Sequence, residues 1–169
     1  MPTLSEVCPG CGATFARIDG PIHSYMESSP SCWAAYGQVL ACEYGDPRLL
    51  AVHRLSVDAY AVQHPGKPSR RSIQSVGLHL LRLFLQLERG LPAEQANAAM
   101  LSIGRHKKTF HWLEPPASLG AITVADVLQC EDTDQHTAAV RSWARSALSA
   151  WSSHRTTLEH WLAAAEFEK

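Results

Sequence analysis

The sequence has 169 residues, of which 46% are hydrophobic and 18% charged. This composition is that of a globular chain and excludes a disordered or collagen-like protein. The 15 basic and 16 acidic residues give a formal charge of -1, and no run of Lys or Arg exceeds two, so we expect no nucleic-acid partner. The length predicts a single domain over residues 1–169, with an arm at 1–31 and a helical bundle at 32–169.

The apolar stretches are far shorter than the ~20 residues that cross a bilayer, so we expect no membrane partner. Residues 1–7 lack the basic start and apolar core of a signal peptide, and the expected location is therefore the cytoplasm. The chain holds five cysteines, an odd number, and a reducing cytoplasm disfavours disulfides between them.

The first half of the chain changes from loop to helix near Pro30. Residues 1–31 are rich in Gly, Pro and Ser, which is typical of irregular structure. A helix is expected from about Pro30 to Gly45, capped by Ser29 or Ser31. Asp46 and the following proline predict a second helix start, and that helix should stop before Pro65.

The second half of the chain predicts four more helical segments. A third helix is expected from about 70 to 89, a shorter fourth one from 92 to 100, and a loop over 106–122. Thr123 and Asp126 resemble a capping box for a short helix to 130. An apolar seam of tryptophans predicts one long last helix over 133–167. Strand signals are nearly absent, so the sequence predicts an all-α fold: an irregular bundle of about five helices with a loop-rich N-terminal metal-binding arm.

The strongest local motif is a Cys-x-x-Cys pair with Pro and Gly between the cysteines. Cys8 and Cys11 can bind one metal ion at ~2.3 Å if the turn between them is tight, and Zn²⁺ is the ion that this motif favours. A tetrahedral site needs two more ligands, and His23 and Cys32 are the nearest suitable residues in the same arm. We therefore predict a zinc site made by Cys8, Cys11, His23 and Cys32.

Alternatives to this ligand set stay open. The fourth ligand could be a distant histidine such as His64, or a water molecule. A redox function of the Cys8–Cys11 pair normally requires a helix that follows a strand, and no such strand is predicted here. Unligated thiols are the remaining possibility. Cys130 has no partner pattern and is expected to be a small buried apolar residue, and the same is expected of Cys42.

Histidines are frequent, with nine in the chain, and several fall on predicted helices. The short connection between the second and third helices makes these helices antiparallel neighbours, which could bring His79 near His53. A polar pocket there would use His53, Asp58, His64 and His79 as acid–base groups or as a second metal site. The competing interpretation is that each of these is a hydrogen-bonded core or surface residue.

The chain resembles an uncharacterised bacterial domain family. The resemblance rests on the CPGCG start at Cys8, on residues 19–25, on the SPSCW step at Ser29, and on the motifs at 53–66 and 70–76. These motifs occur in the family's order and cover about residues 8–165. The resemblance implies a shared fold and a shared site but supplies no activity.

Two main kinds of function are compatible with these residues, beside a metal sensor or carrier in which the histidines would collect a second ion. One is a small metalloenzyme that acts on a small molecule by hydrolysis or group transfer, with three protein ligands and an open metal position. The other is a non-catalytic, zinc-stapled module that binds a protein or a small molecule. The number of protein ligands to the metal distinguishes the two.

Overall fold

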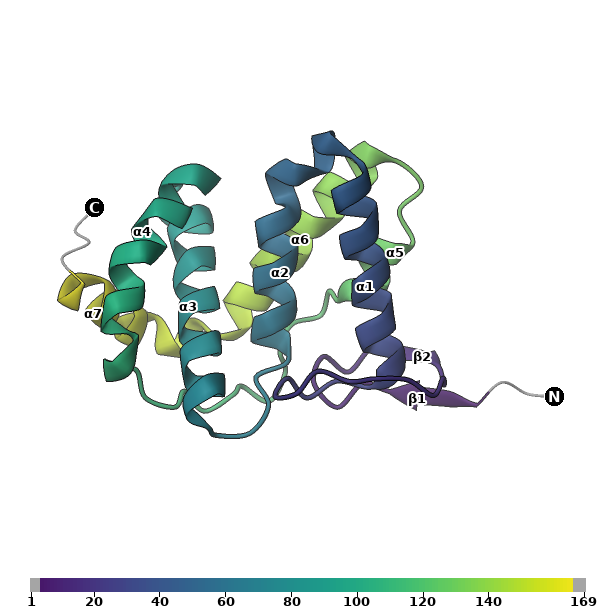
Figure 1. Cartoon of the computed structure of the whole chain (residues 1–169), viewed down its shortest axis with the longest axis horizontal. Coiled ribbons are helices and arrows are strands. Elements are labelled where there is room, and N and C mark those ends of the chain that lie inside the picture. Colours follow the sequence, from purple (N-terminus) through teal and green to yellow (C-terminus); the bar gives the residue numbers. More distant parts are fainter. Residues whose placement is uncertain (1–3, 166–169) are drawn as a thin grey trace.

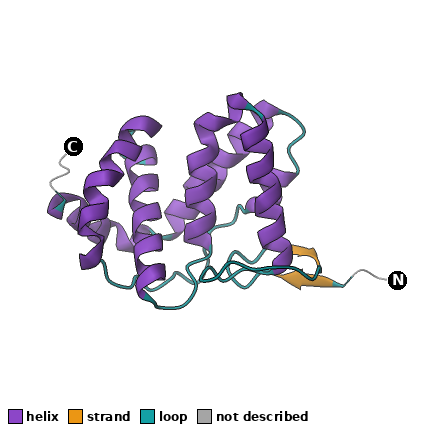
Figure 2. Ribbon diagram, viewed as in Figure 1, coloured by secondary structure: helices purple, strands orange, loops and turns teal. Residues whose placement is uncertain are grey.

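The computed structural model describes residues 4–165 and is mostly helical, with seven α-helices and one two-stranded sheet (Figures 1 and 2). The predicted all-α class with a loop-rich N-terminal arm is confirmed. The sheet is a small addition that the sequence does not predict, because each of its strands has only three residues.

The N-terminal arm begins with an antiparallel hairpin of β1 (Ser5–Val7) and β2 (Thr14–Ala16), in which Val7 pairs with Thr14. The turn between the strands is tight: the Cys8 N–H donates to the Ala13 carbonyl at 2.8 Å, and the Gly12 N–H donates to the Cys8 carbonyl at 3.0 Å. Gly12 has a φ of 75°, which a residue without Cβ adopts at little cost. The hairpin therefore fixes the backbone of the Cys-x-x-Cys motif.

Helices α1 (Pro30–Gly45) and α2 (Leu50–Gln63) follow the arm and are joined by the short 3-10 helix η1 (Pro47–Leu49). Ser29 caps α1, because its side chain accepts the Cys32 N–H at 3.2 Å. Asp46 caps η1 through the Arg48 N–H, so the predicted helix start at Asp46 is a 3-10 turn that leads into α2.

The middle of the chain forms α3 (Arg70–Leu87), α4 (Ala93–His106), the 3-10 helix η2 (Lys107–Thr109) and the short α5 (Val124–Leu128). Helix α4 runs six residues beyond the predicted end at Met100. The predicted capping box of α5 is present, with the Thr123 N–H donating to Asp126 Oδ2 at 2.7 Å.

The C-terminal segment contains a break that the sequence does not predict. It forms α6 (Thr133–Ala150), the 3-10 helix η3 (Ser152–His154) and α7 (Arg155–Ala164), so the prediction of one helix over 133–167 is wrong. Residues 166 and 167 of that prediction lie outside the described residues. The break occurs at Trp151, which is 1% exposed and whose indole N–H donates to the Val62 carbonyl at 3.1 Å. This contact accompanies a change of direction that brings α7 against α3 and α4.

The helices form two halves, which meet where α2 contacts α3 (Figure 1). Helices α1 and α2 make one half, α3 and α4 make the other, and α6 crosses behind and contacts both α2 and α3. Helix α2 is buried along most of its length, and the core contains Tyr60, Phe84, Trp143 and Trp151 at 2% exposure or less. Large aromatic side chains of this kind contribute much of the hydrophobic stabilisation of a core. Among the described helices, none combines the length and apolarity needed to cross a bilayer.

Candidate metal centre

Four buried side chains converge where the arm meets the helices. Their ligand atoms all lie within 4.8 Å of one another, and we call them the CCCH group: Cys8, Cys11, Cys32 and His64. The group could hold a metal ion. It contains three of the four predicted ligands, and the fourth member is His64, one of the open alternatives, and not His23.

The distances within the CCCH group fit a tetrahedral ion. Metal–sulfur bonds of ~2.3 Å and metal–nitrogen bonds of ~2.0–2.1 Å place two sulfurs about 3.8 Å apart and a sulfur and a nitrogen about 3.6 Å apart. The Cys11 and Cys32 sulfurs are 3.7 Å apart. His64 Nε2 lies 3.4 Å from both the Cys8 and the Cys32 sulfur. An ion at the centre would therefore need little rearrangement of these side chains.

Three separate elements supply the CCCH group. The turn after β1 carries Cys8 and Cys11, the first turn of α1 carries Cys32, and His64 is the C-terminal cap of α2. Gly10 lies against α2, because a Cβ built on it would come within 2.4 Å of His64 Cδ2 and 2.8 Å of the Gln63 carbonyl oxygen. The glycine of the motif is thus required for the turn to approach the helix end.

The orientation of His64 is fixed by Tyr60, one turn earlier on α2. His64 Nδ1 donates to the Tyr60 carbonyl at 2.7 Å, and the two rings stack with centroids 3.9 Å apart. This hydrogen bond places the proton on Nδ1 and leaves the Nε2 lone pair directed at the sulfurs, an arrangement common for metal-ligating histidines. The Tyr60 hydroxyl lies 3.7 Å from the Cys32 sulfur.

The electrostatics of the three thiols favour a cation between them. Hydrogen bonds from Cys11 and Cys32 lower the pKa of Cys8, so one thiolate forms readily. Hydrogen bonds to Cys11 and Cys8, together with burial, raise the pKa of Cys32 far above its usual range. A second and third negative charge are therefore opposed in this buried space, and a bound cation would offset that repulsion.

His23, the predicted fourth ligand, has a different position. Its Nδ1 accepts the backbone N–H groups of Tyr25 and Met26 at 3.4 and 3.2 Å, and its ring lies 5.1 Å from that of Trp33. Burial and the charge of Arg71 lower its pKa. These contacts commit Nδ1 to the local turn of the arm, outside the CCCH group.

The other predicted site residues belong to two further groups, each built on a fully buried carboxylate. His79 Nδ1 lies 2.7 Å from Asp58 Oδ1, and Arg82 Nε donates to Asp58 Oδ2 at 2.8 Å. His53 instead lies 2.8 Å from Glu43 Oε2. The structure therefore joins Asp58 with His79 but separates both from His53 and from His64.

Glu43, Arg82 and His136 are members of these groups that sequence reasoning missed. Besides His53, the Glu43 carboxylate has His136 Nε2 at 3.0 Å and accepts a hydrogen bond from the Ser56 hydroxyl. The available signal is the position of Glu43 four residues after Val39, on the buried face of α1. An acidic residue on an apolar face must be paired or functional, because isolated buried charge is costly.

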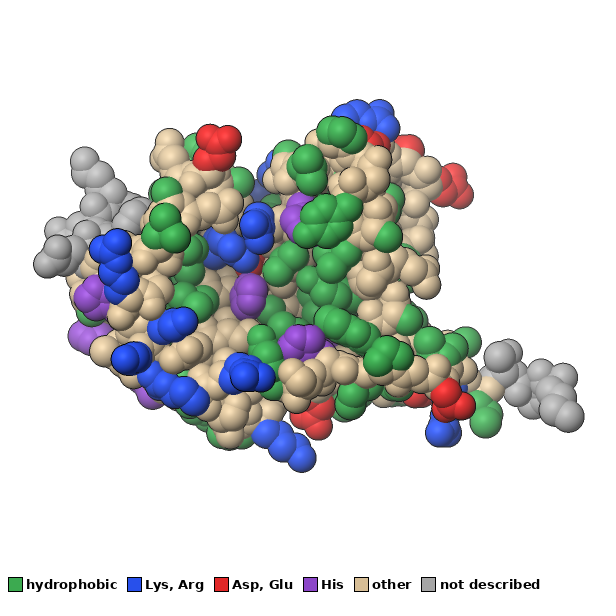
Figure 3. Space-filling model, in the orientation of Figure 1, with side chains coloured by type: hydrophobic (Ala, Val, Ile, Leu, Met, Phe, Trp, Pro, Cys, Tyr) green, Lys and Arg blue, Asp and Glu red, His purple; other side chains and the backbone are tan. Residues whose placement is uncertain are grey.

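Asp58 of α2 joins His79 and Arg82 of α3. Figure 3 shows histidine and basic side chains in the hollow between the α1–α2 half and the α3–α4 half. The side chains of His79 and Arg82 are 21% and 14% exposed, whereas that of Asp58 is fully buried. The buried Asp58 carboxylate thus binds two partly exposed basic side chains, those of His79 and Arg82.

The chain was compared with known proteins. No curated protein and no solved structure matches it. A family model described as "Family of unknown function (DUF5946)" matches residues 6–152, a span that includes the whole CCCH group and both buried carboxylates. The predicted membership of an uncharacterised domain family is confirmed, and the chain belongs to this family of unknown function.

Proposed function

We propose that the CCCH group binds one Zn²⁺ and that the ion has a structural role. The observation that carries the proposal is the donor set: three thiols and one imidazole complete a tetrahedral shell and leave no position for water or substrate. Soft sulfur donors favour zinc among the common divalent ions of cells. The site is also closed to solvent, with Cys8, Cys32 and His64 at 1% exposure or less.

The proposed ion would staple the N-terminal arm to the ends of α1 and α2. Other contacts hold the arm as well: the Ser31 hydroxyl and N–H both donate to Glu6 Oε1, at 2.5 and 3.2 Å. Ala13, Phe15 and Met26 of the arm also pack against the core. Metal binding to such a site would add directly to the free energy of folding. Of the two predicted functions, this supports the zinc-stapled module more than the metalloenzyme.

The Asp58–His79 pair supports a second candidate function, acid–base catalysis on a small molecule. Because the Asp58 carboxylate binds Nδ1, the Nε2 lone pair of a neutral His79 ring is free on a partly exposed side chain. In this candidate, hydrolytic activity found in a screen with chromogenic esters would be lost in His79→Gln and retained in His106→Gln. Retention of the activity in His79→Gln would exclude it.

Elemental analysis and metal substitution test the zinc proposal. Protein purified without chelator should contain one zinc per chain, and the Co²⁺ form should show the visible absorption of a tetrahedral thiolate site. Cys32→Ser should lose the metal and melt at a lower temperature. Cys42→Ser should change neither, because Cys42, on the same helix, is exposed and not buried as expected from the sequence. Absence of metal from the wild type, or its full retention in Cys32→Ser, would contradict the proposal.

A further inference from the structure

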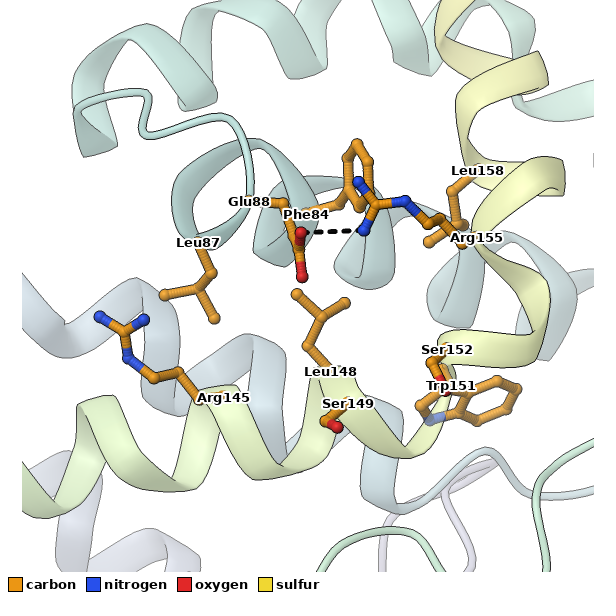
Figure 4. Close-up of a pocket in the computed structure, with 10 residues that line it drawn as sticks. All are labelled: Phe84, Leu87, Glu88, Arg145, Leu148, Ser149, Trp151, Ser152, Arg155 and Leu158. Atoms are coloured by element: carbon orange, nitrogen blue, oxygen red, sulfur yellow. Dashed lines mark hydrogen bonds and ion pairs between the residues drawn. The ribbon is translucent and has the colours of Figure 1, made fainter.

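A cavity of about 150 Å³ lies on the opposite half of the molecule from the CCCH group, between the C-terminal end of α3, the C-terminal end of α6 and the start of α7 (Figure 4). The apolar part of its walls comes from all three elements: Phe84, Leu87, Leu148, Trp151 and Leu158. Two serines, Ser149 and Ser152, also line it. Apolar cavities of about 150 Å³ are large enough to bind a benzene ring. The size therefore fits one ring.

One side of the rim is closed by Arg155. Its guanidinium lies 2.9 Å from Glu88 Oε2 and 3.2 Å from Glu159 Oε1, and it sits 5.1 Å from the centre of the Phe84 ring. Two carboxylates and an aromatic face thus hold this cation in place and neutralise it. Figure 4 shows the Arg155–Glu88 pair beside the apolar walls.

The other side of the rim carries Arg145. Its side chain extends from α6 toward Leu87 in Figure 4, at the opposite end of the cavity from Arg155. Within residues 4–165, the ion pairs do not include Arg145. A guanidinium that borders an apolar cavity without a carboxylate partner is suited to bind a carboxylate of a ligand through two parallel hydrogen bonds.

We propose that this cavity binds a small monocyclic carboxylate. The ring would occupy the apolar space beside Leu87 and Leu148, and the carboxylate would pair with Arg145 at that end of the cavity. A small-molecule site typically combines apolar walls with a few polar groups that fix the orientation of the ligand. The acidic lining residue, Glu88, is paired with Arg155 at 2.9 Å, so Arg145 is the lining charge without an ion-pair partner among the described residues, and an anionic ligand would pair with it.

The proposal does not depend on the zinc site, because no member of the CCCH group lines this cavity. It can therefore be tested on the protein as purified. The probes are sodium benzoate, benzyl alcohol as a neutral ring of similar size, and acetate as a charge without a ring. Amide chemical shifts in two-dimensional NMR spectra report both the affinity and the residues affected.

Benzoate is expected to bind with a millimolar dissociation constant and to shift the amides of α3, α6 and α7 around the cavity. Benzyl alcohol should bind about tenfold more weakly, because it lacks the charged pair with Arg145, and acetate should not bind measurably. Arg145→Gln should weaken benzoate about tenfold, since it removes the same pair. Arg141→Gln, an exposed arginine on α6 outside the cavity, should leave the affinity unchanged.

Three results would overturn the proposal. The first is the absence of benzoate-dependent shifts around the cavity in the wild type. The second is equal affinity of wild type and Arg145→Gln for benzoate. The third is binding of benzyl alcohol as tight as that of benzoate. Because Arg145 is exposed, its replacement is not expected to unfold the protein, and loss of binding in that variant can be assigned to the rim.

Discussion

Cys32 and His64 are 32 residues apart in the sequence, yet the Cys32 sulfur and His64 Nε2 lie 3.4 Å apart. The two helices between them explain this. Helix α1 has 16 residues and α2 has 14, so both are roughly 21–24 Å long at ~1.5 Å per residue. A chain that goes up one helix and down another of similar length returns to its starting level. Cys32 in the first turn of α1 and His64 at the end of α2 therefore meet.

Replacement of His64 should remove the metal, whereas replacement of His23 should not. His64→Ala leaves three thiols with an open fourth position, and we expect at least a tenfold loss of zinc affinity and a lower melting temperature. His23→Ala removes two local hydrogen bonds of the arm and should lower the melting temperature only slightly. Competition of each variant with a chromogenic chelator measures the affinity.

The comparison of the two histidine variants also shows whether His64 or His23 is the fourth ligand. If His23→Ala lost the metal and His64→Ala retained it, the arrangement of the CCCH group would be incorrect. Equal losses in both variants would indicate a general effect on the arm. Circular dichroism of both apo proteins checks that the helices remain folded, so that the loss of metal reports on ligation.

Gly10→Ala should weaken metal binding although it changes no ligand. A Cβ at position 10 would lie 2.5 Å from the Glu27 carbonyl oxygen and closer still to the His64 ring, so the turn must move away from α2. Gly37→Ala provides a matched control, because this exposed glycine of α1 has no atom within 4 Å of the added Cβ. The control should stabilise the helix by about 0.5–1 kcal/mol. Metal affinity and urea denaturation measure the two effects. Unchanged metal affinity in Gly10→Ala would contradict the close approach of the Gly10 turn to the end of α2.

The site could be predicted in part from the sequence. The spacing of Cys8 and Cys11 is a local property, and Cys32 is the nearest further cysteine, so their candidacy as ligands can be inferred from neighbouring residues. The choice between His23 and His64 depends on tertiary structure. Proximity in sequence favoured His23, whereas the matched lengths of α1 and α2 bring His64 to the three cysteines.

The fold could be predicted where local sequence signals are strong. The prediction failed where tertiary contacts determine the bounds of a helix. The caps at Ser29, Asp46 and Thr123 predicted helix starts close to those in the structure. The seam of tryptophans predicted a continuous helix, because periodicity does not show that the Trp151 indole bonds to the Val62 carbonyl of another helix. The three-residue strands are too short to give an alternating pattern.

Glu43→Gln should destabilise the protein because the amide cannot replace both carboxylate oxygens. His53, Ser56 and His136 all contact this carboxylate, and an amide places an NH₂ group opposite at least one of these groups. We expect a loss of about 1–3 kcal/mol in the free energy of unfolding. The exposed Glu131→Gln variant should differ from wild type by less than about 0.5 kcal/mol. Equal stability of the two variants in urea would show that the buried carboxylate is not needed.

Asp58→Ala should be more harmful than the simultaneous removal of Asp58 and its cationic partner. The single variant leaves Arg82, whose side chain is 14% exposed, without its carboxylate partner. Loss of one partner of a buried pair costs about 3–5 kcal/mol. The double variant Asp58→Ala with Arg82→Met removes both charges, so part of the lost stability should return. Urea denaturation of the zinc-loaded proteins measures the coupling between the two sites. A double variant as unstable as the sum of the two single variants would show that Arg82 does not depend on Asp58 for its compensation. Recovery, in contrast, would mean that the pair contributes little net stability and that the cost of the single variant comes from the uncompensated guanidinium.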